Sequence, residues 1–490
     1  MPGEQMPGAD PLRDDGSTPD ATSDSAPLSR PEHNGVRHAL PLFQSLSAIV
    51  AELESLTEAG RMRPGSRFKR ICELDDYVRA ITESALASST GSIMQPRHYR
   101  DPAVFVARDV FGSVLDAYLN CRAQMSLGDQ VLAARIARAA AERVKWEQFS
   151  GGPPHEGLWQ AASEALSQAS VAGARATPID GDEVVHEGAV EQEYLRALAY
   201  FSAGYEQLAP DLFGVVNRLV DIALPMLGLY KKPLSGTVYY IDLSRGASPT
   251  RFVQVPERAD GVRYFSTRRA YEFLQKMDLA LKRGELPREL DLIPVERDLL
   301  CAALEHLIIQ WSVAPPVRRN RRHPVDGALH AVQGYDRVHA LLESGDLSDP
   351  LHLLFVDVSR GGVGVLMESG VTPAICVGAL VAIRPLEGGV WHLEMVQRVW
   401  QESGMRMILG LMTLSIAPRV LDVTTGAETQ SVLVCDPLLR GEAVRIVAPL
   451  GGCELGDMLY ATQQGERHEL RRLVTQARGH DFAVLAYQVQ

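Results

Sequence analysis

Two short polar motifs in the second half of the chain carry residue types that bind anions and bases. One is the basic run Arg318 to Arg322 (RRNRR), and the other is Asp357 to Gly362 (DVSRGG). A guanidinium fork pairs with two phosphate oxygens or with O6 and N7 of guanine, and its flat face stacks on a base. An aspartate accepts N–H groups, a serine hydroxyl bonds a phosphate or a base edge, and glycines let the backbone come close. The two motifs therefore predict a site for a ligand that carries both phosphates and bases.

The spacing within the motifs is also distinctive. Arg318 and Arg322 form an Arg-x-x-x-Arg pattern, and Asp357, Ser359 and Gly362 form an Asp-x-Ser-x-x-Gly pattern. In this order, with the first pattern on an arm and the second in a turn between strands, the pair resembles the PilZ domain. Members of that family are receptors for the bacterial second messenger cyclic di-GMP. The resemblance covers about residues 315 to 425.

The resemblance implies a small antiparallel β-barrel that binds cyclic di-GMP with no metal, no other cofactor and no catalytic residue. It places Arg318 and Arg322 on the guanine and phosphate groups of the ligand. Asp357, Ser359 and Gly362 then hold the other side. Because the basic run contains more than one arginine frame, there are secondary candidates for the site. These are Arg319, Arg321 and Gly361.

Each motif also has an explanation that involves no ligand. A basic run is typical of a solvated arm, and an Asp-x-Ser turn is typical of a loop in which both side chains cap backbone N–H groups. A related stretch at Asp242 to Ala247 (DLSRGA) lacks the final glycine, and no Arg-x-x-x-Arg pattern precedes it. We expect this second stretch to be a hairpin turn.

The spacing of apolar residues predicts the elements that position these motifs. Residues 1–37 are rich in Pro, Gly, Ser, Thr and Asp, which predicts a disordered acidic leader. Apolar residues then recur every three or four positions, which predicts a helical region over residues 38–228. The predicted helices are Leu42 to Leu56, Phe68 to Leu86, Ala103 to Met125, Val131 to Phe149, Leu158 to Leu166, Glu193 to Leu208 and Leu212 to Leu224.

A mixed region follows over residues 229–313. Its predicted strands are Thr237 to Leu243 and Thr250 to Val255, and its predicted helices are Ser266 to Arg283 and Val295 to Trp311. Residues 314–425 begin with the linker Ala314 to Pro324. They continue as short apolar or alternating segments separated by glycine turns, which favours an antiparallel sandwich or a small barrel.

Residues 426–490 are predicted to be a short β-rich C-terminal extension that contains one helix, Glu469 to Ala477, and a last strand, Phe482 to Val489. The predicted fold class is therefore multidomain α plus β. A helical N-terminal region precedes a PilZ-like barrel with an Arg arm.

The composition of the chain and the motifs that it lacks argue against several classes of protein. The 490 residues carry 49 basic and 61 acidic side chains, a formal charge of −12, and no apolar run long enough to span a bilayer. The six cysteines form no CxxC pair, and the first residues lack the basic and apolar regions of a signal peptide, so a cytoplasmic location is expected. The chain has no GxxxxGK[ST], GxSxG or HExxH motif, which argues against the common hydrolase classes.

The sequence thus predicts a bacterial cyclic di-GMP receptor and adaptor that is not an enzyme. Its helical region would pass the signal to an unknown protein partner in motility or biofilm regulation. One alternative is a nucleic-acid-binding protein that uses Arg318 to Arg322, which the net charge of −12 opposes. Another is a helical scaffold whose PilZ-like domain binds no ligand.

Overall fold

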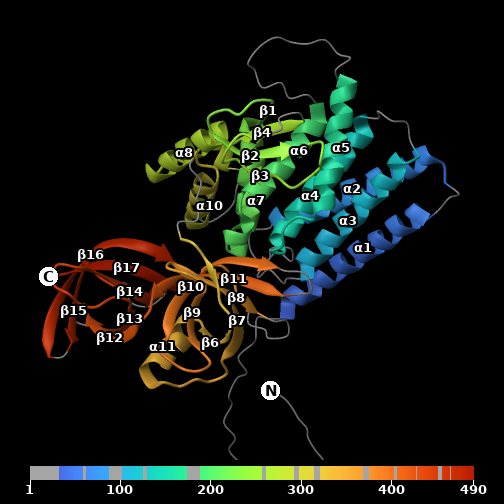
Figure 1. Ribbon diagram of the computed structural model, residues 1–490. Helices are drawn as coiled ribbons and strands as arrows, with labels where there is room; N and C mark the ends of the chain where they lie inside the picture. The colour runs from blue at the N-terminus through green and yellow to red at the C-terminus, as the bar shows by residue number, and fades with distance from the viewer. Residues whose placement is uncertain are drawn as a thin grey trace, which may run out of the picture.

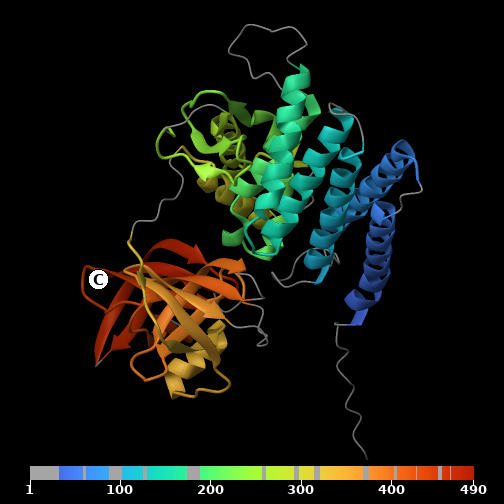
Figure 2. The same cartoon turned by 45° about the vertical axis from the view of Figure 1, so that its right-hand side comes forward.

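The computed structural model describes residues 33–58, 62–87, 102–124, 130–173, 188–256, 261–291, 297–313, 320–367, 375–401, 406–425, 428–450, 455–463 and 465–490. A helical region lies above two β-barrels in the view of Figure 1, and the turned view of Figure 2 shows the same two lobes. The expected α plus β fold class is confirmed. Residues 1–32 of the predicted leader lie outside the described residues, and the first helix already begins at His33, inside that leader.

The helical region contains the helices that apolar spacing predicts. They are α1 (His33–Glu58), α2 (Pro64–Ala87), α3 (Pro102–Arg122), α4 (Gln130–Phe149), α5 (Glu156–Gly173), α6 (Gly188–Ser202) and α7 (Phe213–Ala223), with short 3-10 turns η1 (Tyr205–Gln207), η2 (Pro210–Leu212) and η3 (Leu224–Met226). Helix α4 lies at the centre and packs against α3, α5 and α6. Its small residues, such as Ala137 and Ala140, are fully buried and let the neighbouring helices approach closely.

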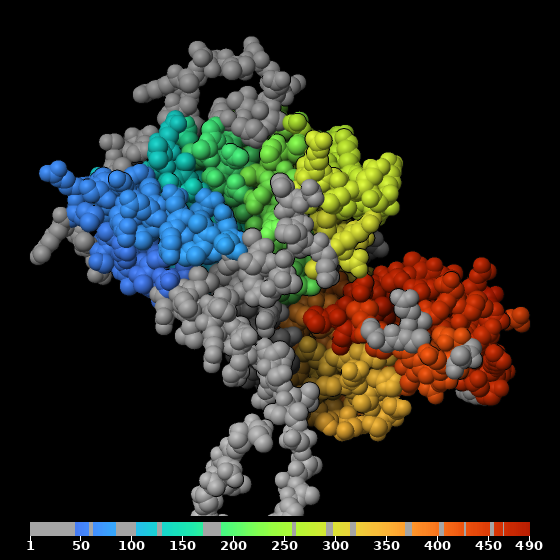
Figure 3. All heavy atoms as spheres, turned by 180° about the vertical axis from the view of Figure 1, so that it is seen from behind, coloured from blue at the N-terminus to red at the C-terminus, as the bar shows by residue number. Residues whose placement is uncertain are grey.

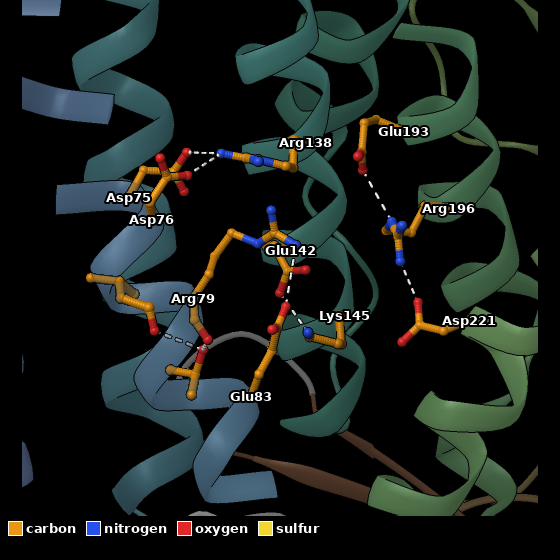
Figure 4. Close-up of polar contacts among 12 residues, drawn as sticks. Asp75, Asp76, Arg79, Glu83, Arg138, Glu142, Lys145, Glu193, Arg196 and Asp221 are labelled. Carbon is orange, nitrogen blue, oxygen red and sulfur yellow. Dashed lines mark hydrogen bonds and ion pairs between the residues drawn. The ribbon is translucent and has the colours of Figure 1, made fainter. Parts of the chain in front are cut away.

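Helix α4 also carries charged side chains into the interior. Glu142 and Lys145 are almost fully buried, and the Lys145 ammonium lies 2.5 Å from Glu142 Oε2. Figure 4 shows this pair among further charges on α2, α4, α6 and α7. On one side Asp75 accepts hydrogen bonds from Tyr118 and Arg138, both at 2.8 Å. A buried pair of this kind is costly to break, because either partner alone would be an uncompensated charge.

A small antiparallel sheet follows the helices, in the order β1-β4-β2-β3. Its strands are β1 (Gly228–Tyr230), β2 (Thr237–Asp242), β3 (Thr250–Arg251) and β4 (Val262–Ser266), and its helices are α8 (Arg268–Lys282), α9 (Arg288–Asp291) and α10 (Arg297–Gln310). The stretch at Asp242 to Ala247 connects the antiparallel strands β2 and β3, which confirms the predicted hairpin turn. There Asp242 Oδ1 accepts the backbone N–H of Ser244 at 3.0 Å.

The first barrel contains the Asp-x-Ser turn. Its strands are β5 (His323–Pro324), β6 (Ala328–Gln333), β7 (Leu351–Ser359), β8 (Gly362–Met367), β9 (Leu380–Pro385), β10 (His392–Gln401) and β11 (Met407–Ser415). Pairing runs β7-β6-β9-β10-β11-β8, and β8 pairs back to β7, so these six strands close into a ring with β5 added at β7. Alternate residues such as Leu353, Val365 and Leu409 are fully buried in its core.

Helix α11 (Tyr335–Ser344), which the sequence did not predict, joins β6 to β7 and covers part of this barrel. The second barrel covers another part, since Leu380 and Leu393 of the first barrel share a buried cluster with α11 and with Leu433 of the second. Asp481 of the second barrel accepts the backbone N–H of Tyr335 at 2.7 Å. Figure 3 shows the two barrels as one continuous lobe.

The second barrel is more than the β-rich extension that was predicted. Strands β12 (Arg419–Thr424), β13 (Thr429–Val434), β14 (Ala443–Pro449), β15 (Met458–Gln463), β16 (Glu466–Arg478) and β17 (Phe482–Val489) close in the order β12-β13-β14-β17-β16-β15. The predicted helix over Glu469 to Ala477 is wrong, because this segment belongs to β16. Its Glu, Leu, Arg, Gln and Ala residues favour a helix locally, but pairing with both β15 and β17 outweighs that preference.

Candidate functional site

The arm reaches the Asp-x-Ser turn through a short strand. Strand β5 directly follows Arg322 and pairs with the end of β7, with Pro324 opposite Asp357 and His323 opposite Val358. This pairing brings Arg322 to Asp357, and Arg322 Nη1 donates to Oδ1 at 2.8 Å and to Oδ2 at 2.9 Å. The two side chains keep 29% and 20% of their surface exposed. One predicted arginine and the predicted aspartate therefore form an ion pair that solvent can reach.

The turn between β7 and β8 holds the next two predicted residues. Ser359 pairs with Gly362, and Ser359 Oγ donates to the Gly362 carbonyl at 3.1 Å. A Cβ atom at Gly362 would lie 2.0 Å from the Leu411 carbonyl oxygen, so only glycine fits this close strand approach. Gly361 is exposed, and a Cβ there would lie 3.1 Å from the Asn320 side chain. The arm thus lies against the turn.

Strand register extends the site across the outer face of the barrel. Asp357 is opposite Gly364, Gly364 is opposite Gly410, and Gly410 is opposite Arg398, so these four residues form one line that we call the glycine row. A Cβ at Gly364 would lie 3.1 Å from Arg322 Nη1, and one at Gly410 would lie 4.0 Å from Arg322 Nη2. The Arg322 guanidinium therefore lies directly over backbone, beside the Asp357 carboxylate and on the row that ends at Arg398.

An apolar row runs beside the glycine row. It consists of Leu354, Leu366, Ile408 and Trp400, which are paired in this order across β7, β8, β11 and β10. The Arg398 guanidinium lies over the Trp400 ring, 4.7 Å from its centroid. A flat, charged ligand would meet cations and backbone on one row and apolar surface on the other, which suits a nucleotide base joined to a phosphate.

The structure brings together Arg322, Asp357, Ser359 and Gly362 of the predicted primary set. Of the others, Arg321 and Gly361 are exposed beside them, and Arg318 and Arg319 lie outside the described residues. Sequence reasoning missed Gly364, Gly410 and Arg398. The signal was a glycine between two apolar residues, in Val363-Gly364-Val365 and in Leu409-Gly410-Leu411, since glycine inside a strand marks a close approach.

A separate cavity of about 420 Å³ opens further along β11, between the two barrels. Arg360 from the turn and Arg419 line it, together with Arg445. Arg445 is already paired with Asp436, to which its Nη2 and Nε donate at 2.6 and 2.8 Å. Burial would raise the pKa of Asp436, but the hydrogen bonds from Arg445 outweigh it and hold the pKa below its ordinary value. This pair therefore joins β14 to the segment that follows β13, within the second barrel.

Comparison with known proteins adds evidence from the helical region. Residues 38–230 match the family described as cyclic-di-GMP receptor FimW, N-terminal domain. The match supports a cyclic di-GMP receptor family. A receptor acts by binding, so the match also favours a binding protein over an enzyme. The match begins within α1, continues through α7 to β1, and ends before the two barrels begin. A comparison with curated proteins found no match.

The described part of the chain was also compared with the requirements of a metal site and of a membrane-spanning helix. Within it, no three His, Cys, Asp or Glu side chains come together as a metal site. None of its helices is long and apolar enough to cross a membrane.

One ionisable group of the barrel is buried without a charged partner. Glu394 on β10 is fully buried, and Thr413 Oγ1 donates to its Oε1 at 3.0 Å, while Oε2 has no partner among the described residues. Burial raises the pKa of Glu394 to about 8, against the smaller opposing effect of the Thr413 hydrogen bond. The carboxyl group is therefore protonated at neutral pH.

We expect Glu394→Gln to remove a pH dependence of stability. In the unfolded chain Glu394 ionises near 4.5, whereas the folded protein keeps the proton up to about 8, so the free energy of unfolding falls as pH rises between these values. At pH 8 the free energy of unfolding of the variant should exceed that of wild type by about 4 kcal/mol, because each pH unit between the two pKa values contributes about 1.4 kcal/mol. Urea unfolding at pH 5.5 and pH 8 measures the difference. Exposed Glu387→Gln is the control. An unchanged pH slope in Glu394→Gln would show that the carboxyl group ionises normally.

Proposed function

We propose that the first barrel is a PilZ-like domain that binds cyclic di-GMP across the glycine row. Arg322, together with Arg318 of the arm, pairs with guanine and phosphate. Asp357 accepts the N1 and N2 hydrogens of a guanine, and Ser359 and Gly362 hold the turn against the other side of the ligand. The closed six-stranded ring supports this proposal, because the resemblance implied a small antiparallel barrel.

The observation that carries the proposal is the pair of Arg322 and Asp357 over Gly364. Its two groups are complementary to a guanine nucleotide, since the fork donates to phosphate or to O6 and N7 while the carboxylate accepts N1 and N2. A partly exposed ion pair contributes only about 0 to 1 kcal/mol. A hydrogen bond to a charged group contributes about 1.5 to 3 kcal/mol. Exchanging the internal pair for two charged contacts to the ligand is therefore favourable.

The helical region is the proposed output. It matches the N-terminal domain of a cyclic di-GMP receptor family, and it stands before the barrel that we propose as the sensor. We infer that it passes the signal to a protein partner, in the cytoplasm of a bacterium, as part of motility or biofilm regulation. No catalytic step is required of either part.

Calorimetric titration of the full chain with cyclic di-GMP tests the proposal directly. Binding held by shape and by a few charged contacts should persist at 0.5 M salt, whereas binding of a polyanionic nucleic acid falls steeply with salt. A chain that takes up no cyclic di-GMP, or that binds RNA in its place, would refute the proposed function.

The base preference tests the role of Asp357. Cyclic di-AMP has no N1 and N2 donors, so wild type should bind it far more weakly than cyclic di-GMP. Asp357→Ala should lower this preference by about tenfold, the effect of one hydrogen bond to a charged group. The comparison needs titrations of both proteins with both dinucleotides. Equal affinity of wild type for the two ligands would show that only phosphate is recognised.

A further inference from the structure

Arg398 occupies the end of the glycine row and belongs to none of the motifs. It lies on β10 opposite Gly410, and its Nη2 lies 3.2 Å from Oε1 of Glu206. Its side chain is 40% exposed, and that of Glu206 is 13% exposed. The Nε atom of Arg398 is buried and has no hydrogen-bond partner among the described residues. One edge of the guanidinium therefore holds a carboxylate through one nitrogen only.

Glu206 belongs to the helical region, on the turn η1. This turn is connected to the core of the helical region, because the Tyr205 ring packs against Phe149 and Phe213 with centroids 4.9 and 5.5 Å away. Gln310 at the end of α10 donates to Gln207 at 3.3 Å. A change at Glu206 therefore reaches both the core around α4 and the helix that precedes the arm. Figure 1 shows β10 and β11 near the foot of α7, and β10 packs against η1.

We propose that Arg398 binds the ligand, and that in the free protein its guanidinium is paired with Glu206 instead. The inference rests on the proposed function of the first barrel. A phosphate of the dinucleotide takes the Nε and Nη2 edge of Arg398, where Nε is unpaired and Nη2 holds Glu206. Binding at that edge displaces the carboxylate and frees η1. The ligand thereby breaks a contact between the barrel and the helical region.

The relative strength of the two contacts favours the phosphate. The pair with Glu206 uses one nitrogen at a partly exposed site, where ion pairs contribute little. A phosphate that engages both nitrogens forms a bidentate pair, which is stronger and more directional. It also gives the buried Nε the partner that it lacks. The Glu206 carboxylate keeps one hydrogen bond after Arg398 leaves it, because Gln207 Nε2 donates to Glu206 Oε1 at 3.1 Å.

Titration of full-length variants with cyclic di-GMP tests whether Glu206 and the ligand compete for Arg398. Arg398→Ala should weaken binding about tenfold. Glu206→Gln should strengthen it about two- to fivefold, because the competing carboxylate is gone. The double variant should bind like Arg398→Ala alone. The control is Glu272→Gln, which removes the same charge from a pair with Arg268 at 3.0 Å on α8 and should leave affinity unchanged.

Hydrogen exchange tests the release of η1. The N–H groups of Gln207 and Leu208 donate to Gly204 and Tyr205 at 2.9 and 3.1 Å. Their exchange should rise when cyclic di-GMP binds, and in Glu206→Gln it should already be raised without ligand. Unchanged affinity in Arg398→Ala and Glu206→Gln, in a chain whose wild type binds cyclic di-GMP, would overturn the inference and leave the proposed function intact. Slower exchange of these amides on binding would contradict the proposal that the ligand frees η1. A wild type that binds no cyclic di-GMP would refute the proposed function itself.

Discussion

Arg322→Ala is expected to weaken the binding of cyclic di-GMP by about ten- to a hundredfold, the effect of losing about 1.5 to 3 kcal/mol of charged hydrogen bonding. Arg322 lies over Gly364 and Gly410, beside Asp357 and on the row that ends at Arg398, where no other described arginine of the arm reaches. Removing Arg322 also leaves Asp357 without its partner, so the negative charge of Asp357 faces the ligand phosphates without a neutralising cation. Isothermal titration of the full chain measures the loss.

Arg321→Ala is the matched control for this prediction. Arg321 is the neighbour of Arg322 in the same run, carries the same charge and is exposed to solvent. Its loss should change affinity by no more than about twofold, because a solvated cation contributes little beyond screened attraction. A larger loss in Arg321→Ala than in Arg322→Ala would show that the arm binds in the other arginine frame. Folding should be unaffected in both, since neither side chain is buried.

The sequence predicted most of the fold because the helices and strands obey local rules. The helices from α2 to α7 follow the spacing of three and four in their apolar residues, and the strands of the first barrel follow alternation between glycine turns. The proximity of the two motifs was also predictable, and the structure brings Arg322 to Asp357 and Ser359 to Gly362. Strand β5 brings these stretches together.

The missed features depend on pairing between distant segments. The segment of β16 was predicted to be helical, because its local residue types favour a helix, and only its two partner strands make it extended. Strand β12 reads as a continuation of the first barrel in the sequence, but it pairs with β13 and β15 of the second. Arg398 looks like an ordinary strand residue. It joins the candidate site only through its register with Gly410 and its contact with Glu206.

The second barrel also limits where a ligand can bind. Together with α11 it covers outward side chains of β6, β9 and β10, such as Val332, Leu380 and Leu393. The glycine row lies on the other side, over β7, β8 and β11, where Asp357 and Arg322 remain partly exposed. The edge of that open face at Arg398 meets the helical region. The open surface therefore lies where a ligand can contact both the barrel and the helices.

Lys145→Met is expected to lower the stability of the helical region by about 3 to 5 kcal/mol, because it leaves Glu142 as a buried charge without its closest partner. Burial would raise the pKa of Glu142, but the Lys145 ammonium and the Arg79 guanidinium outweigh it and hold the pKa below its ordinary value. Lys145 also lies over the Tyr200 ring at 5.4 Å. Thermal unfolding followed by circular dichroism should show the helical transition lowered by about 6 to 20 °C.

Two further variants separate the lost charge pair from a general effect of the substitution. Lys282→Met removes a lysine that is 66% exposed and paired with Asp278 at 2.7 Å, so it should cost no more than about 1 kcal/mol. Adding Glu142→Gln to Lys145→Met should recover much of the loss, because no unpaired charge then remains inside. If Lys145→Met instead loses no more stability than Lys282→Met, then water must reach Glu142, and the surroundings of this side chain are less dry than the packing indicates. If Lys145→Met loses the expected stability and adding Glu142→Gln recovers none of it, the aliphatic part of Lys145 and its aromatic contacts, rather than its charge, hold α4 in place.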